Sequence, residues 1–109
     1  MVTPAFPHCS FRDKHADDMG MMLEYIFPWA VLYYPAGIVP VTTVTKEEES
    51  FEDSYKDGWT KLIDETAKGS AGLPIGVQVI AHTYEDEKAL AVMQSIEDRV
   101  KFRMPAPSI

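Results

Sequence analysis

The strongest hydrophobic patterns in the chain are two short runs rich in β-forming residues. Ile38–Thr45 is dense in β-branched side chains, and Ile75–Ala81 places Ile, Val and Val at every second position. A turn signal precedes each run, with Pro35 and Gly37 before the first and Leu73-Pro74 before the second. A period of two with β-branched residues predicts strands, and we expect the two runs to be adjacent in one sheet.

The first run has the character of a strand that is covered on both faces, because nearly all of its residues are apolar. Pro40 interrupts it and cannot donate to a strand ladder, so it predicts a bulge or an edge position. A third, short extended piece is expected at Met1–Pro7, which has proline near both ends.

Apolar residues spaced three and four apart predict a helix over Asp13–Tyr34. Pro28 lacks the donor that an inner turn needs, so it should kink this helix or split it. The predicted buried face consists of Met19, Met22, Leu23, Ile26, Ala30 and Tyr33.

Two further helices are predicted. The acidic stretch Lys46–Asp57 should begin one of them, with an apolar stripe formed by Phe51, Tyr55, Trp59 and Leu62. The other covers Glu85–Lys101, and Thr83–Asp86 resembles a capping box at its start. Its predicted buried face consists of Leu90, Met93, Ile96 and Val100.

Composition narrows the function classes. With 109 residues, 46% apolar and 25% charged, the chain is long enough for one ordinary globular domain. A formal charge of -7 argues against nucleic acid as a partner and against electrostatic docking on anionic lipid. Cys9 is the only cysteine, which fits a reducing compartment, and the N-terminus lacks signal-peptide features. We therefore expect a soluble, intracellular segment.

Few residues offer catalytic or metal-binding chemistry by themselves. Ser70, in Gly69-Ser-Ala-Gly72, fits a plain turn much better than a nucleophile. Cys9 follows His8, but neighbours on an extended chain point to opposite sides, so a small half-buried cysteine is expected instead of a catalytic pair. The three histidines lack zinc-site spacing, and the acidic runs lack the glycine pattern of a calcium loop. We therefore expect no metal site.

Two strings carry a family resemblance. Tyr34-Pro-Ala-Gly-Ile-Val-Pro-Val-Thr-Thr-Val-Thr45 and Gly72-Leu-Pro-Ile-Gly-Val-Gln-Val-Ile-Ala81 resemble, in order and spacing, the closing segment of the amidase signature family of serine hydrolases. The first is closest to the fatty acid amide hydrolase branch. The resemblance implies an α/β fold in which residues 1–109 form the C-terminal part of a larger mixed sheet covered by helices. It also implies hydrolysis of fatty acid amides or similar apolar amides without a metal or organic cofactor.

The family's Ser-Ser-Lys catalytic residues lie far upstream of the matching segment, and this sequence has no counterpart to them. The resemblance therefore assigns no catalytic residue here and makes the upstream part of the amidase domain the expected partner. It does suggest three side chains for the acyl channel: Leu23, Phe27 and Trp59. By themselves, these three fit core positions better than a ligand site.

Other interpretations stay open at this stage. The chain could be a binding or scaffold module derived from an amidase, a regulatory partner of a longer relative, or a non-functional gene fragment. The sequence also leaves open a homodimer, the preferred amide head group and membrane attachment of a full enzyme.

Overall fold

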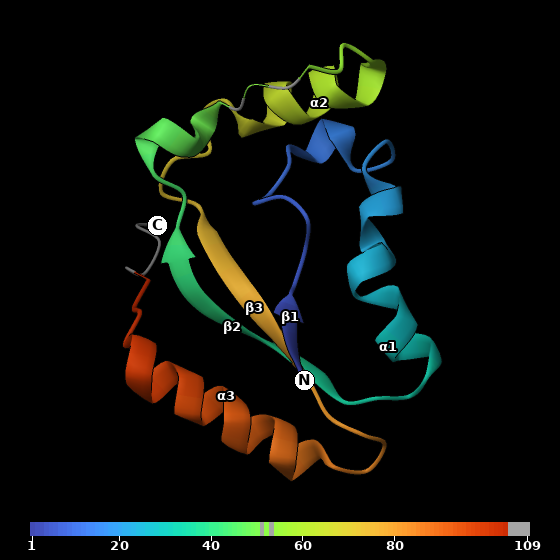
Figure 1. The fold of residues 1–109 in the computed structure, drawn as a ribbon, viewed down its shortest axis with the longest axis vertical. Helices are drawn as coiled ribbons and strands as arrows, with labels where there is room; N and C mark the ends of the chain where they lie inside the picture. Colours follow the sequence, from blue (N-terminus) through green and yellow to red (C-terminus); the bar gives the residue numbers. More distant parts are fainter. Residues whose placement is uncertain (51, 53, 105–109) are drawn as a thin grey trace.

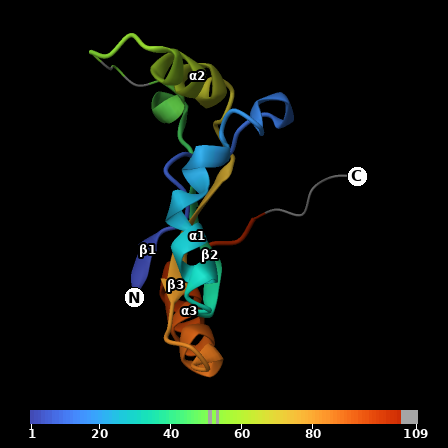
Figure 2. The same ribbon diagram turned by 90° about the vertical axis from the view of Figure 1, so that its right-hand side faces the viewer.

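The computed structural model describes residues 1–50, 52 and 54–104. Three strands, three α-helices and three 3-10 helices (η) make up this part of the chain (Figure 1). In chain order they are β1 (Val2–Pro4), η1 (Asp13–His15), η2 (Gly20–Tyr25), α1 (Phe27–Val31), β2 (Ala36–Thr43), η3 (Lys46–Glu49), α2 (Gly58–Ala67), β3 (Pro74–Ile80) and α3 (Asp86–Val100). Figure 2 shows α2 at one end of the molecule and α3 at the other.

The three strands form one antiparallel sheet in the order β1-β3-β2. The two predicted runs therefore pair with each other, with Val39 opposite Val77 and Ile38 opposite Gln78. Pro40 lies on the edge strand, and the register shifts between Pro40 and Thr42. Both the pairing and the special position of Pro40 are confirmed.

The sheet lies between α3 and the η2–α1 segment, as Figure 1 shows. Alternate strand residues point to opposite faces, so Val79 faces α3 while Gln78 faces the other way. Gln78 is 2% exposed, and its Nε2 donates to the Tyr25 carbonyl oxygen at 3.1 Å. The core between sheet and helix consists of Val39, Val77, Val79, Ala81, Ala89, Met93 and Ile96.

Close packing of α3 explains a glycine in the first motif. A Cβ atom built on Gly37 would overlap the sulfur of Met93. A side chain at this position would displace the end of the Met93 side chain, so the glycine leaves room for Met93 to lie directly on β2.

Only one face of β2 is covered within this chain. Its residues alternate between exposed and covered positions, and Ile38 is 54% exposed. α3 covers one face and little covers the other, so the described residues do not supply the second cover that the apolar character of the strand calls for.

The last helix forms where it was predicted, but two of its details were wrong. Leu90 is 62% and Val100 43% exposed, whereas Ala89 is buried in their place. The helix turns its Ala89–Met93–Ile96 row to the sheet, so Leu90 points past the edge of β2. The predicted capping box is also absent, because the cap residue Glu85 makes no side-chain capping hydrogen bond.

The helix predicted over residues 13–34, kinked or split at Pro28, was the largest error, because most of the segment is not α-helical. The segment instead forms η1, η2 and the five-residue α1, with Pro28 in the first turn of α1. The predicted split at Pro28 is confirmed. α1 starts at Phe27, so Pro28 lies in its first turn, where a backbone N–H has no acceptor within the helix and proline therefore loses no hydrogen bond. Met19 is completely buried, whereas Tyr33 is 83% exposed and has a φ of 55°, so the predicted apolar face does not exist as one surface.

The predicted helix starting at Lys46 was also wrong in extent. Among the described residues of this stretch η3 forms at Lys46–Glu49, and α2 starts later, where the Asp57 carboxylate accepts a hydrogen bond from Thr60 N at 2.8 Å. Side-chain capping of this kind fixes a helix start. The expected stripe is therefore divided, and its Phe51 lies outside the described residues.

Candidate functional site: an exposed apolar surface

Two of the three candidate acyl-contacting residues lie in the segment that faces away from α3. Leu23 belongs to η2 and is 47% exposed, and Phe27 begins α1 and is 63% exposed. Neither lies in the hydrophobic core. Their segment is held to the sheet by the Gln78–Tyr25 hydrogen bond, so exposed apolar side chains sit on an anchored backbone.

More apolar side chains are exposed in the same segment. Their exposed fractions range from 37% to 83%, which is unusual for so many neighbouring large residues. They are Met21, Tyr25, Val31, Leu32 and Tyr33. Exposed apolar side chains gathered in one segment are typical of a ligand-binding or protein-binding face.

Trp59, the third candidate, lies in the first turn of α2 and is 45% exposed. Figure 1 shows α2 across one end of the molecule and α1 along its side. The described chain thus presents the three candidates on three elements, with η2 and α1 in one segment and α2 apart from them.

Ser70 occupies a tight turn between α2 and β3. It is 1% exposed, and its Oγ has no hydrogen-bond partner in the described part of the chain. Gly69 and Gly72 flank the turn with φ values of 81° and 86°, which glycine adopts without strain. A buried hydroxyl without a base beside it lacks the activation that a nucleophile needs.

The geometry of Cys9 corrects the sequence-based argument about its neighbour. Cys9 Sγ lies 3.4 Å from His8 Nδ1, because the chain bends here and does not continue as a strand. Burial lowers the pKa of His8, against opposing backbone hydrogen bonds, so its imidazole is neutral near pH 7. The expectation of a half-buried thiol agrees with the intermediate exposure of Cys9.

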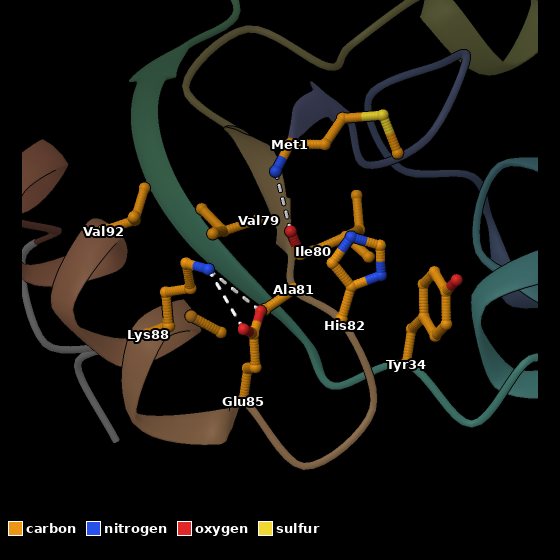
Figure 3. A pocket seen from close by; sticks show the side chains of 10 residues that line it. Met1, Tyr34, Val79, Ile80, Ala81, His82, Glu85, Lys88 and Val92 are labelled. Atoms are coloured by element: carbon orange, nitrogen blue, oxygen red, sulfur yellow. Dashed lines mark hydrogen bonds and ion pairs between the residues drawn. The ribbon is translucent and has the colours of Figure 1, made fainter.

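Sequence reasoning missed a hollow of about 410 Å³ between the end of β3 and the start of α3 (Figure 3). Val79, Ile80 and Val92 contribute to its apolar lining. The Tyr34 and His82 rings meet edge to face with their centroids 5.3 Å apart. His82 directly follows the predicted run Ile75–Ala81 and Tyr34 stands four residues before the run Ile38–Thr45, and this position near the ends of two pairing strands was the signal in the sequence that could have placed them together.

An ion pair lies on the rim of this hollow. Lys88 Nζ donates to both carboxylate oxygens of Glu85 at 3.1 Å. The hydrogen bond from Lys88 is the main cause that lowers the pKa of Glu85. The charges of Glu85 and Lys88 therefore pair with each other at the rim.

The described residues form neither a metal-ligand cluster nor a membrane-spanning helix. No cluster of three or more His, Cys, Asp or Glu side chains there could hold a metal ion. No helix in the same part of the chain combines the length and the hydropathy that a bilayer crossing requires.

The fold and the two strand motifs define a class of protein: the chain belongs to the Amidase family, whose sequence model matches residues 1–90. Among curated relatives, fatty-acid amide hydrolase 1 of Sus scrofa is 39% identical over 79 residues, and that of Caenorhabditis elegans is 38% identical over 78. Each alignment covers 69% of this chain. The A subunit of glutamyl-tRNA(Gln) amidotransferase of Chlorobium luteolum is 29% identical over 108 residues, or 97% of the chain.

These alignments cover only a small part of each relative. The chain spans 14% of the length of both fatty-acid amide hydrolases and 17% of the amidotransferase subunit. The comparisons therefore establish family membership for this chain, and the activity of a whole protein is a matter for a proposal.

Proposed function

We propose that this chain is the acyl-side portion of an amide hydrolase that acts on fatty acid amides or similar apolar amides. In this proposal the chain supports the sheet and shapes the acyl pocket, and it contributes neither the nucleophile nor the base. The upstream part of the amidase domain is its partner and supplies the serine that attacks the amide carbonyl.

The observation that carries the proposal is the exposed apolar surface around Leu23 and Phe27. An acyl chain gains about 0.8 kcal/mol for each methylene that leaves water, so it needs a wall of apolar side chains. Only acidic charges, Asp17, Asp18 and Glu24, occur between His15 and Lys46. The surface therefore suits the uncharged tail of an amide better than a charged ligand. Trp59 would line the same pocket only if the upstream part bridges α1 and α2.

Similarity to the two fatty-acid amide hydrolases supports the substrate class. Those relatives bear that activity in their names and share nearly two fifths of the aligned residues with this chain. The amidotransferase subunit matches a longer stretch at lower identity, so it supports the family but not the apolar substrate.

A chimera tests the acyl-side role. The matched segment of the Sus scrofa enzyme is replaced by the matching residues of this chain, and kcat/KM is measured for long-chain and short-chain acyl amides. We expect Phe27→Ala to lower kcat/KM about tenfold for the long-chain amide, since a half-buried aromatic contact contributes 1 to 2 kcal/mol. The short-chain value should stay within about twofold.

Tyr84→Ala is the matched control, because Tyr84 is 92% exposed and lies in the turn before α3. Tyr84→Ala should change kcat/KM for neither the long-chain nor the short-chain amide. Equal losses for both substrates with Phe27→Ala would contradict a role in acyl binding.

A second test uses the chain alone. It should hydrolyse no fatty acid amide above background, and Ser70→Ala or Cys9→Ala should change nothing. Turnover that disappears with either substitution would refute the proposed division of labour. A folded chimera without activity would favour the alternative of a scaffold module.

A further inference from the structure

Helix α1 is too short to hold its shape by itself. It has five residues, Phe27–Val31, and no side chain caps its first turn. Because starting a helix fixes several residues for few hydrogen bonds, an isolated helix of this length is unstable in water. Contacts outside the helix therefore fix α1 and its neighbour η2 on the sheet. The same contacts decide where the exposed side chains of Leu23 and Phe27 lie.

One backbone carbonyl joins the two helical pieces to the sheet. The Tyr25 carbonyl oxygen accepts a hydrogen bond from Trp29 Nε1 at 3.0 Å and another from Gln78 Nε2 at 3.1 Å. A carbonyl oxygen has two lone pairs, so it can accept both bonds at once. Trp29 lies on α1 and Gln78 on β3, and Tyr25 ends η2. Because Tyr25 stands midway between Leu23 and Phe27 in the sequence, the backbone between these two candidates is held from the helix and from the sheet.

The ring of Trp29 makes a second contact, with Tyr34. The two rings stack with their centroids 6.4 Å apart and an angle of 15° between their planes. Tyr34 in turn meets the ring of His82 edge to face at 5.3 Å, and Figure 3 shows these two rings beside each other. Both arrangements are among those that aromatic pairs prefer. Since His82 follows the end of β3, Trp29 reaches the sheet through these rings as well as through the Tyr25 carbonyl.

Tryptophan combines the two features that this position uses. Its indole carries one N–H donor, and its ring has a broad apolar face. Phenylalanine at position 29 would keep a face for Tyr34 but would leave the Tyr25 carbonyl with the bond from Gln78 alone. The substitution Trp29→Phe therefore separates the hydrogen bond from the stacking contact.

We propose that Trp29 is a positioning residue: through the Tyr25 carbonyl it sets the orientation of Leu23 and Phe27, and thereby the preference for long acyl chains. This inference rests on the proposed function, in which Leu23 and Phe27 contact the acyl chain. Trp29 acts through these two side chains, since its N–H and its stacked ring face are engaged within the chain. Every methylene of an acyl chain gains from burial, so a displaced apolar wall loses more contacts with a long chain than with a short one.

The structural part of the proposal is tested on the 109-residue chain, independently of any activity. Hydrogen exchange followed by NMR reports on two backbone amides of the segment: Ile26 N donates to the Leu23 oxygen, and Tyr34 N donates to the Trp29 oxygen. Trp29→Phe should raise both exchange rates about fivefold, as expected for one lost hydrogen bond, and leave the β2–β3 amides within about twofold. Tyr84→Phe, a control at a 92% exposed position, should change neither rate. Unchanged rates with Trp29→Phe would overturn the proposal.

The functional part uses the chimera with the Sus scrofa enzyme and the ratio of kcat/KM for long-chain and short-chain amides. Trp29→Phe should lower this ratio about fivefold by raising KM for the long-chain amide, with kcat within about twofold. A residue that only supports the fold would lower kcat/KM for both substrates. With Phe27→Ala already present, Trp29→Phe should lower the ratio by no more than about twofold further, because it acts through that side chain.

Tyr34→Leu is a second variant, which removes the stacking contact and keeps the indole donor. It should lower the ratio less than Trp29→Phe does, and a larger effect would contradict action through the Tyr25 carbonyl. Equal losses for both substrates with Phe27→Ala would refute the proposed function itself. A length-selective loss with Phe27→Ala but not with Trp29→Phe would refute only the positioning role, and so would fully additive effects in the double variant.

Discussion

The unit formed by β2, β3 and α3 and the segment formed by η2 and α1 use apolar residues in opposite ways. In the first, Val39, Val79 and Ala89 are buried between sheet and helix. In the second, Leu23 and Phe27 remain exposed on short helical turns. Apolar side chains thus stabilise the fold in one region and form a solvent-exposed surface in the other. This difference supports a division between scaffold and binding surface.

Replacing an apolar residue by aspartate should give the largest difference in stability between the two regions. Val79→Asp places an unpaired carboxylate where the native side chain is 1% exposed, and we expect the chain to lose its cooperative fold. Leu23→Asp should change the free energy of unfolding by no more than about 0.5 kcal/mol, because that side chain is half exposed. Urea denaturation followed by circular dichroism compares the two variants. Equal destabilisation would show that Leu23 is a structural residue.

The link between the two regions should have an intermediate effect. Gln78→Ala removes the donor to the Tyr25 carbonyl and should destabilise the chain by about 1 to 3 kcal/mol. Hydrogen exchange should speed up in η2 while the β2–β3 amides change little. A uniform increase across the sheet would mean that Gln78 supports the core and does not mainly anchor η2.

Acid should have the smallest effect and should act outside both regions. A hydrogen bond from Lys46, then one from the Ala71 N–H, and to a lesser extent the charge of Lys46 lower the pKa of Glu49. A carboxyl whose pKa is lower in the folded chain contributes stability above its unfolded pKa of about 4.5, and this contribution is lost as pH falls through the folded pKa. Thermal unfolding between pH 7 and pH 3 should show a smaller pH dependence for Glu49→Gln. An unchanged profile would contradict this assignment.

The sequence predicted the regular region well because its signals are local. Alternating β-branched residues specify β2 and β3, and Pro40 marks the edge strand. The same reasoning failed where tertiary contacts decide the outcome. Spacings of three and four over residues 13–34 also fit successive 3-10 turns, and on α3 the sheet selects Ala89 over Leu90 for burial.

The candidate site was predictable only in part. The resemblance identified Leu23, Phe27 and Trp59, but no pattern in the sequence revealed that Leu23 and Phe27 would be exposed on an anchored segment. Tyr34 and His82 are 48 positions apart and meet only because β2 and β3 pair in register. Contacts of that kind depend on the sheet, which local patterns do not encode.

Native-state hydrogen exchange of the 109-residue chain tests the central claim, a stable scaffold carrying a less stable binding surface, most directly. The inward amides of β2 and β3 should exchange only by global unfolding, at rates at least about 100-fold below those of the η2 and α1 amides. Equal protection of both regions would contradict the account, because the apolar surface would then be part of one uniformly stable fold.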